Sequence, residues 1–191
     1  MTARTARASR SGRAVVFLTV LIAAVAFDQG SKAWARTLPV PAHCETKDLI
    51  ARECAGIPQP VIAGYWDWEL ALNSGAAFSS FASFAGTGTG VILSLIAVLA
   101  VIAIGVTAAR SRPEERLKRV ALALIAGGAL GNLIDRIHQG AVTDFVRWHV
   151  HDHMWPIFNV ADAALLVGVA FLIVERALSH RAKSRGTPAA A

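Results

Sequence analysis

Residues 91–109 read VILSLIAVLAVIAIGVTAA, an apolar run without a single charged side chain. An α-helix needs about 20 such residues to cross the roughly 30 Å hydrocarbon core of a bilayer. Residues 156–174 form a second long run, in which Asp162 is the only charge. Two shorter apolar segments, residues 14–27 and 120–134, each run into a polar cluster. The sequence therefore predicts an all-α membrane protein with four transmembrane helices.

The overall composition agrees with this class of protein. Of 191 residues, 54% are hydrophobic, which is too many for an ordinary soluble domain. The chain is nevertheless basic, with 19 Lys and Arg against 13 Asp and Glu. These basic residues flank the apolar runs and do not form a stripe with interleaved aromatic residues, so the sequence indicates no nucleic-acid partner.

The distribution of basic residues predicts the orientation of the four helices. They gather before the first segment, between the second and third, and after the fourth, whereas the two other connections hold most of the acidic residues. The positive-inside rule then places both termini in the cytoplasm. We expect a basic cytoplasmic tail at 1–13, one membrane domain at 14–178 and a disordered basic tail at 179–191.

The first segment has an alternative interpretation as a cleaved signal peptide. An arginine-rich start, a short apolar core and the triplet Ala24-Val25-Ala26 are typical of such peptides. Its removal would put the two ends of the chain on opposite faces, against the basic residues that follow the fourth segment. We therefore expect the first segment to be an uncleaved helix.

The first outer loop, residues 36–87, is expected to contain a small β-rich element at 61–81. Tyr65, Trp66 and Trp68 would anchor it at the membrane interface. Upstream, Cys44 and Cys54 are candidates for a disulfide, because this loop lies outside the cytoplasm. Two free thiols remain an alternative, and a metal site with His43 lacks an evident fourth ligand.

Two aspartates near the last apolar segment, Asp144 and Asp162, are the candidates for catalysis. A carboxylate at membrane depth is costly to ionise and usually has a function. The competing interpretation of Asp162 is structural, since Asn159 and Asp162 have the spacing of a helix N-cap with a capping box.

The other polar residues at the ends of the apolar segments have a structural explanation. Asp28 and Lys32 have the i, i+4 spacing of a helical ion pair. Asn132, Asp135 and Arg136 would close the third helix at the interface, and Arg136 could also hold an anionic or carbonyl-rich substrate. Three nearby glycines have the spacing of close helix packing: Gly127, Gly128 and Gly131.

Five blocks resemble, in this order, the signature blocks of the lipoprotein signal peptidases, and the resemblance covers residues 14–174. They are DQGSK at 28–32, NSGAAF at 73–78, GGALGNLIDR at 127–136, VTDF at 142–145 and FNVAD at 158–162. Five blocks in order on four apolar segments are far more specific than any one motif.

The resemblance implies an aspartyl endopeptidase of the bacterial inner membrane, with its site near the outer face. Such an enzyme removes the signal peptide from diacylglyceryl-modified prolipoproteins, just before the lipidated cysteine. The catalytic aspartates would be Asp144 and Asp162, without a metal or other cofactor. The substrate-binding positions would be Asn73, Gly75, Asn132, Arg136 and Asn159. Implied partners are membrane lipids and peptide antibiotics such as globomycin, acting on a monomer.

Some features depart from this pattern. Residues 39–60, with both cysteines, look like an insertion of unknown role. His149, His151 and His153 alternate and could share a zinc ion, although the catalytic scheme needs none. Two other classes of protein fit the sequence less well: a transporter would need polar groups along several spans, and a membrane scaffold would not explain the paired acids.

Overall fold

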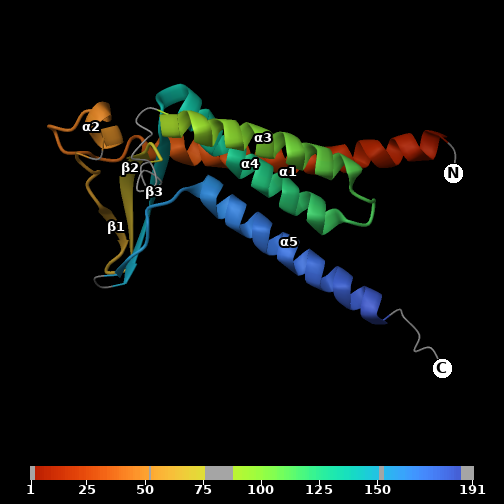
Figure 1. Cartoon of the computed structure of the whole chain (residues 1–191). Helices are drawn as coiled ribbons and strands as arrows, with labels where there is room; N and C mark the ends of the chain where they lie inside the picture. The colour runs from red at the N-terminus through yellow and green to blue at the C-terminus, as the bar shows by residue number, and fades with distance from the viewer. Residues whose placement is uncertain (1–2, 52, 76–87, 151–152, 186–191) are drawn as a thin grey trace.

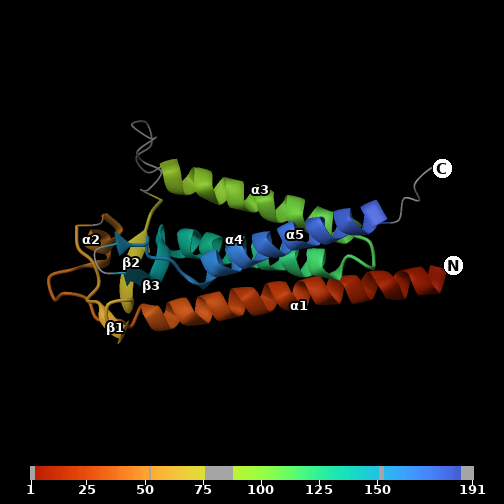
Figure 2. The same ribbon diagram turned by 90° about the horizontal axis from the view of Figure 1, so that it is seen from below.

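The computed structural model describes residues 3–51, 53–75, 88–150 and 153–185. Four long helices form a bundle, with a small sheet at one end (Figure 1). They are α1 (Ala3–Ala35), α3 (Gly88–Arg110), α4 (Arg116–Gln139) and α5 (Val160–Arg185). Helix α4 packs against each of the other three. The start of α1 and the end of α5 both lie away from the sheet (Figures 1 and 2).

Three of the helices are long and apolar enough to cross a membrane. The spans are Gly12–Ala35 of α1, Gly90–Arg110 of α3 and Arg116–Gln139 of α4, as judged over the described part of the chain. Helix α5 is long enough but carries Asp162, Glu175 and Arg176. A fourth span and the orientation of the termini therefore stay predictions.

The helices extend beyond the apolar segments on which they were predicted. Helix α1 begins at Ala3 and runs through the polar cluster at 28–32 to Ala35. Helix α5 continues to Arg185. The helix therefore includes the first part of the region 179–191, which was expected to be a disordered tail, because alanine, lysine and arginine favour helix and a formed helix adds residues easily.

The sheet is antiparallel and has the strand order β1-β2-β3-β4. Strands β1 (Gln59–Ile62) and β2 (Trp66–Asn73) belong to the first outer connection, where a β-rich element was expected. Residues 76–81 of that expected element lie outside the described ranges. Strands β3 (Val142–Val150) and β4 (His153–Met154) come from the second connection, which was not expected to contribute. One sheet thus joins two distant parts of the chain.

Aromatic side chains join the sheet to the end of α1. The ring of Trp34 meets those of Trp68 and Phe145 edge to face, at centroid distances of 5.1 and 5.9 Å. Such pairs are favourable beyond their burial. They place Asp144, the neighbour of Phe145 in β3, against the helical bundle.

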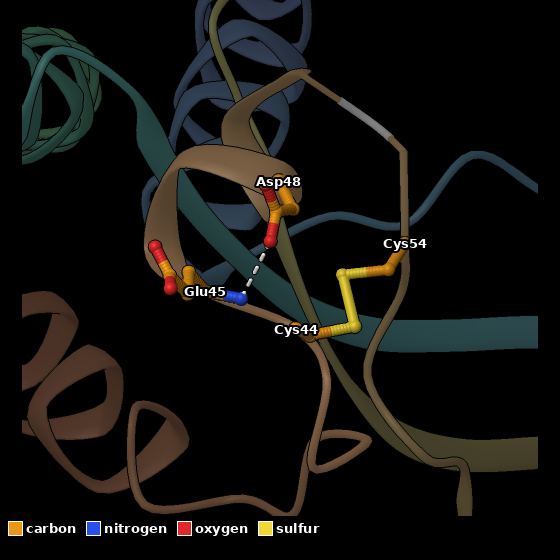
Figure 3. Close-up of a disulfide and its surroundings, with 4 residues drawn as sticks. All are labelled: Cys44, Glu45, Asp48 and Cys54. Carbon is orange, nitrogen blue, oxygen red and sulfur yellow. Dashed lines mark hydrogen bonds between the residues drawn. A yellow bond between two sulfur atoms is a disulfide. The ribbon is translucent and has the colours of Figure 1, made fainter.

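A short helix, α2 (Thr46–Ala51), lies in the region 39–60. A disulfide between Cys44 and Cys54 closes the segment that contains α2 (Figure 3). Leu49 of α2 packs with Leu70 and Leu72 of β2 in a small buried cluster. We call residues 44–55 the disulfide segment.

Glycines of α4 allow the close packing expected from their spacing. A Cβ atom at Gly128 would lie 2.9 Å from Leu165 of α5, and one at Gly131 would collide with the carboxylate of Asp28. Both neighbouring helices therefore approach α4 where a side chain is missing.

Candidate active site

The two candidate carboxylates come from different elements that meet at the sheet end of the bundle. Asp144 lies in β3 and is 3% exposed, and Asp162 lies in the first turn of α5. Asn159 directly precedes α5. Its side-chain oxygen accepts a hydrogen bond from Asp162 N at 3.0 Å, and its own backbone N–H donates to Asp162 at 3.2 Å. This reciprocal arrangement is the capping box that the spacing suggested.

Asn159 does more than begin the helix. Its side-chain Nδ2 donates to Asp144 Oδ1 at 2.6 Å and lies 3.1 Å from Asn132 Oδ1. Asn159 is also fully buried. One asparagine therefore contacts both aspartates, so the structural and catalytic interpretations of this motif do not exclude each other.

Two further asparagines complete the arrangement. Asn73 of β2 donates to Asp144 Oδ2 at 3.1 Å, and Asn132 of α4 donates to Asp162 Oδ1 at 2.9 Å. Gly75 N donates to Asn73 Oδ1 at 3.0 Å, with Gly75 at φ 90°, a conformation that favours glycine. Each carboxylate thus receives two donors, and the donors are amide N–H groups.

The surroundings of Asp144 strongly change its acidity. Burial, followed by repulsion from the Asp162 carboxylate, raises the pKa of Asp144 to about 7, although hydrogen bonds from Asn73 and Asn159 oppose the rise. Two nearby carboxylates in a dry site resist full ionisation. Asp144 can therefore keep a proton near neutral pH.

A buried ionic cluster lies behind Asn132. Lys32 Nζ is 2.9 Å from Asp28 and 3.2 Å from Asp135, and it donates to Asn132 Oδ1 at 2.8 Å. Lys32 and Asp28 are fully buried. Asn132 must then turn its Nδ2 toward Asp162, since its oxygen is taken by Lys32 and Asn159. The pair predicted as structural thus also orients a contact of the candidate site.

Asp135 ties the same cluster to strand β3. It accepts from Thr143 N at 2.9 Å and pairs with Arg36 at 2.8 Å. Arg36 Nε in turn donates to Thr143 Oγ1 at 3.1 Å. Arg36 and Thr143 were not singled out from the sequence, although Arg36 lies one helical turn after Lys32. They fix the residue next to Asp144.

Arg136 lies close to the site, but its guanidinium forms little hydrogen bonding within the described part of the chain. Its Nη1 is 3.5 Å from Asn132 O, and its buried Nε has no hydrogen-bond partner among the described residues. Arg136 lines a cavity of 380 Å³ between α3 and α4, with apolar walls that include Val91 and Leu133. A guanidinium at the end of an apolar cavity can bind a carbonyl or an anion.

The sequence suggested two possible metal sites, one at the cysteines and one in the histidine series. Cys44 and Cys54 are bonded to each other, so they offer no thiolates for a site with His43. In the histidine series, His149 Nε2 lies 3.0 Å from Asp67 Oδ2, and His151 lies outside the described residues. No group of three metal-ligating side chains occurs within the described ranges.

Solved structures share this architecture. The chain resembles a structure described as a bacterial membrane enzyme determined by the in meso method at 1.9 Å, with 28% identity and a TM-score of 0.66 over 83% of this chain and 90% of the other. A second membrane enzyme, at 2.3 Å, is 25% identical with a TM-score of 0.66 over 92% and 93%. This chain, with its apolar helices and a small antiparallel sheet at one end, therefore has the fold of a membrane enzyme.

The sequence identifies the family. Residues 20–178 match the model of the family described as "Signal peptidase (SPase) II". A lipoprotein signal peptidase of Xylella fastidiosa (strain 9a5c) is 41% identical over 161 residues, which cover 81% of this chain and 84% of the relative. That of Geobacter sulfurreducens is 45% identical over 125 residues, covering 65% and 77%. The chain belongs to the signal peptidase II family, so it is a protease.

Proposed function

We propose that this protein is an aspartyl endopeptidase that removes the signal peptides of prolipoproteins, cutting just before the diacylglyceryl-cysteine. One observation carries the aspartyl mechanism: a single buried asparagine, Asn159, contacts both Asp144 and Asp162. This arrangement holds two carboxylates around one small volume. Family membership supports the substrate.

In the proposed reaction the two acids have different roles. The ionised carboxylate of Asp162 takes a proton from water, whose oxygen attacks the scissile carbonyl carbon. Asp144 gives its proton to the carbonyl oxygen, which fits its pKa of about 7. The tetrahedral intermediate then collapses: one of its hydroxyl groups returns a proton to Asp144, the C–N bond breaks, and the amine of the lipidated cysteine leaves with a proton from Asp162.

Arg136 is proposed to bind the substrate on the bundle side. Its buried Nε lacks a partner in the described part of the chain, so a substrate carbonyl would satisfy it. The apolar walls of the adjacent 380 Å³ cavity suit a lipid chain or the hydrophobic part of a signal peptide. Inhibitors such as globomycin are proposed to compete for this region.

We also propose that four helices span the bacterial inner membrane, with both termini in the cytoplasm and the sheet outside. Leu166 and Ile173 of α5 are 72% and 65% exposed, and an apolar surface of this kind suits lipid. The basic stretch 110–119, which joins α3 to α4, lies at the end away from the sheet (Figure 1), as the positive-inside rule requires. The active protein is proposed to be a monomer.

The test is a cleavage assay with a lipidated prolipoprotein and purified protein in lipid nanodiscs. Asp144→Asn and Asp162→Asn should each lower kcat by about 10⁴-fold or more, and Glu175→Gln, which removes a carboxylate of α5 well away from its first turn, should not. Activity should persist in EDTA. Substantial cleavage by either aspartate variant would contradict the mechanism.

A further inference from the structure

A second cavity, of 660 Å³, lies on the sheet side of Asp144. The disulfide segment forms one wall with Leu49, Cys54 and Ala55, and Pro156 and Ile157 contribute from the chain before α5. The remaining lining residues come from β2 and β3. Among the described residues that line it, none belongs to α1, α3, α4 or α5.

This cavity is continuous with the candidate active site. Ala71 of β2 stands directly opposite Asp144 of β3 in the ladder, so their side chains share one face of the sheet. Asn73, two residues farther along β2, shares that face and contacts Asp144. A peptide whose scissile bond lies at Asp144 would therefore enter this cavity on one side.

The chemistry of the substrate decides which side enters. The signal peptide that precedes the cut has an apolar core suited to the membrane helices. The chain that follows the cysteine is the start of a secreted protein and must leave the membrane. A cavity whose described lining comes from the sheet, the disulfide segment and a loop suits that second part.

We propose that this cavity binds the first residues of the mature lipoprotein, those after the lipidated cysteine, and that the disulfide segment limits their size. The inference rests on the proposed function. Apolar side chains form most of the wall, and the buried Glu69 is paired with Arg147. The site should therefore accept small uncharged residues.

The test compares two lipidated prolipoproteins that differ only at the residue after the cysteine, glycine in one and tryptophan in the other. Ala55→Trp narrows the cavity from an exposed position, so it should lower kcat/KM for the tryptophan substrate about 10-fold or more relative to the glycine substrate. Ala51→Trp, on an exposed residue of α2 outside the lining, should leave that ratio unchanged.

A ratio unaffected by Ala55→Trp would overturn the subsite while leaving the protease activity standing. If the unsubstituted protein cleaved neither substrate, the proposed function would fail, and the subsite with it. A measurement independent of turnover uses Asp162→Asn and a lipidated peptide with a photoreactive phenylalanine after the cysteine. Crosslinks should map to residues 49–55, and crosslinks confined to α3 and α4 would refute the assignment.

Discussion

The side-chain amide of Asn159 donates to Asp144 at 2.6 Å, while its oxygen caps the helix that carries Asp162. Asn159→Ala should lower kcat about 100-fold, because Asp144 loses a hydrogen-bond donor and the turn that carries Asp162 loses its side-chain cap. It should also destabilise the start of α5 by about 1 kcal/mol. Cleavage kinetics and thermal unfolding measure the two effects.

Asn159→Ser separates those effects. Serine is a good N-cap but is too short to bridge to Asp144, so stability should return without activity. Recovery of full activity in Asn159→Ser would show that helix capping alone accounts for the contribution of Asn159 to activity.

The pH dependence of cleavage should report Asp144. Its pKa of about 7 means that the protonated form is lost as the pH rises above that value. In the proposed mechanism kcat/KM should then fall about tenfold per pH unit on the alkaline side. Infrared titration of the carboxyl band should give the same midpoint, and a midpoint near 3.8, the ordinary value, would contradict it. In Asp162→Asn the midpoint should move down, because the repelling charge is gone.

Stability should follow the same group. A folded pKa of about 7 above the ordinary value of 3.8 means that Asp144 favours the folded state fully below pH 3.8, and this contribution is lost as the pH rises to about 7. Between pH 4 and pH 8 the parent should therefore lose more thermal stability than Asp144→Asn. Equal losses in the two proteins would exclude Asp144 as the source.

Gly131 and Gly30 offer a matched pair for the packing of α4. Gly131→Ala would push a methyl group into the Asp28 carboxylate and should cost about 1 to 3 kcal/mol of stability. Gly30→Ala, in α1, meets no atom within 4 Å and should be neutral or slightly stabilising. Thermal unfolding in nanodiscs distinguishes the two, and equal shifts would argue against close packing at Gly131.

The buried lysine provides a further test. Lys32→Met leaves Asp28 and Asp135 without their shared cation, which should destabilise the protein by about 3 to 5 kcal/mol. Adding Asp28→Asn should recover part of that loss. Lys47→Met removes an exposed pair with Glu45 and should change stability by no more than about 0.5 kcal/mol. A Lys32→Met protein as stable as Lys47→Met would contradict the network.

The apolar segments were readable from sequence because lipid demands long hydrophobic runs. The ends of the helices could not be predicted in the same way. The polar cluster at 28–32 looks like the end of the first helix, whereas the ion pairs of Lys32 allow this cluster to stay helical and buried. The candidate catalytic aspartates and the asparagines that contact them could be predicted from the sequence motifs that contain them. The partners of Asp135, such as Thr143 and Arg36, depend on contacts between distant segments that no local spacing reveals.

Strand β3 shows a different limit. Polar Arg147 and His149 alternate with apolar Trp148 and Val150, which is typical of a strand, but the stretch is short and its partner strand lies far away in the sequence. Its strand conformation depends on pairing with β2, about 70 residues earlier in the chain. The same pairing forms the face of the sheet on which Asp144 lies. Asp144 could therefore be predicted from its own sequence block, whereas the residues around it could not.

The ladder between β2 and β3 also sets an order of biogenesis. Asn73 pairs with Val142 across two intervening helices, and Asp162 belongs to the final helix. During translation, Asn73 is therefore made early and Asp162 is made last of the residues at the candidate site. In the proposed mechanism, a nascent chain that has made only the elements up to α4 lacks Asp162, so an unfinished copy holds no complete proteolytic centre.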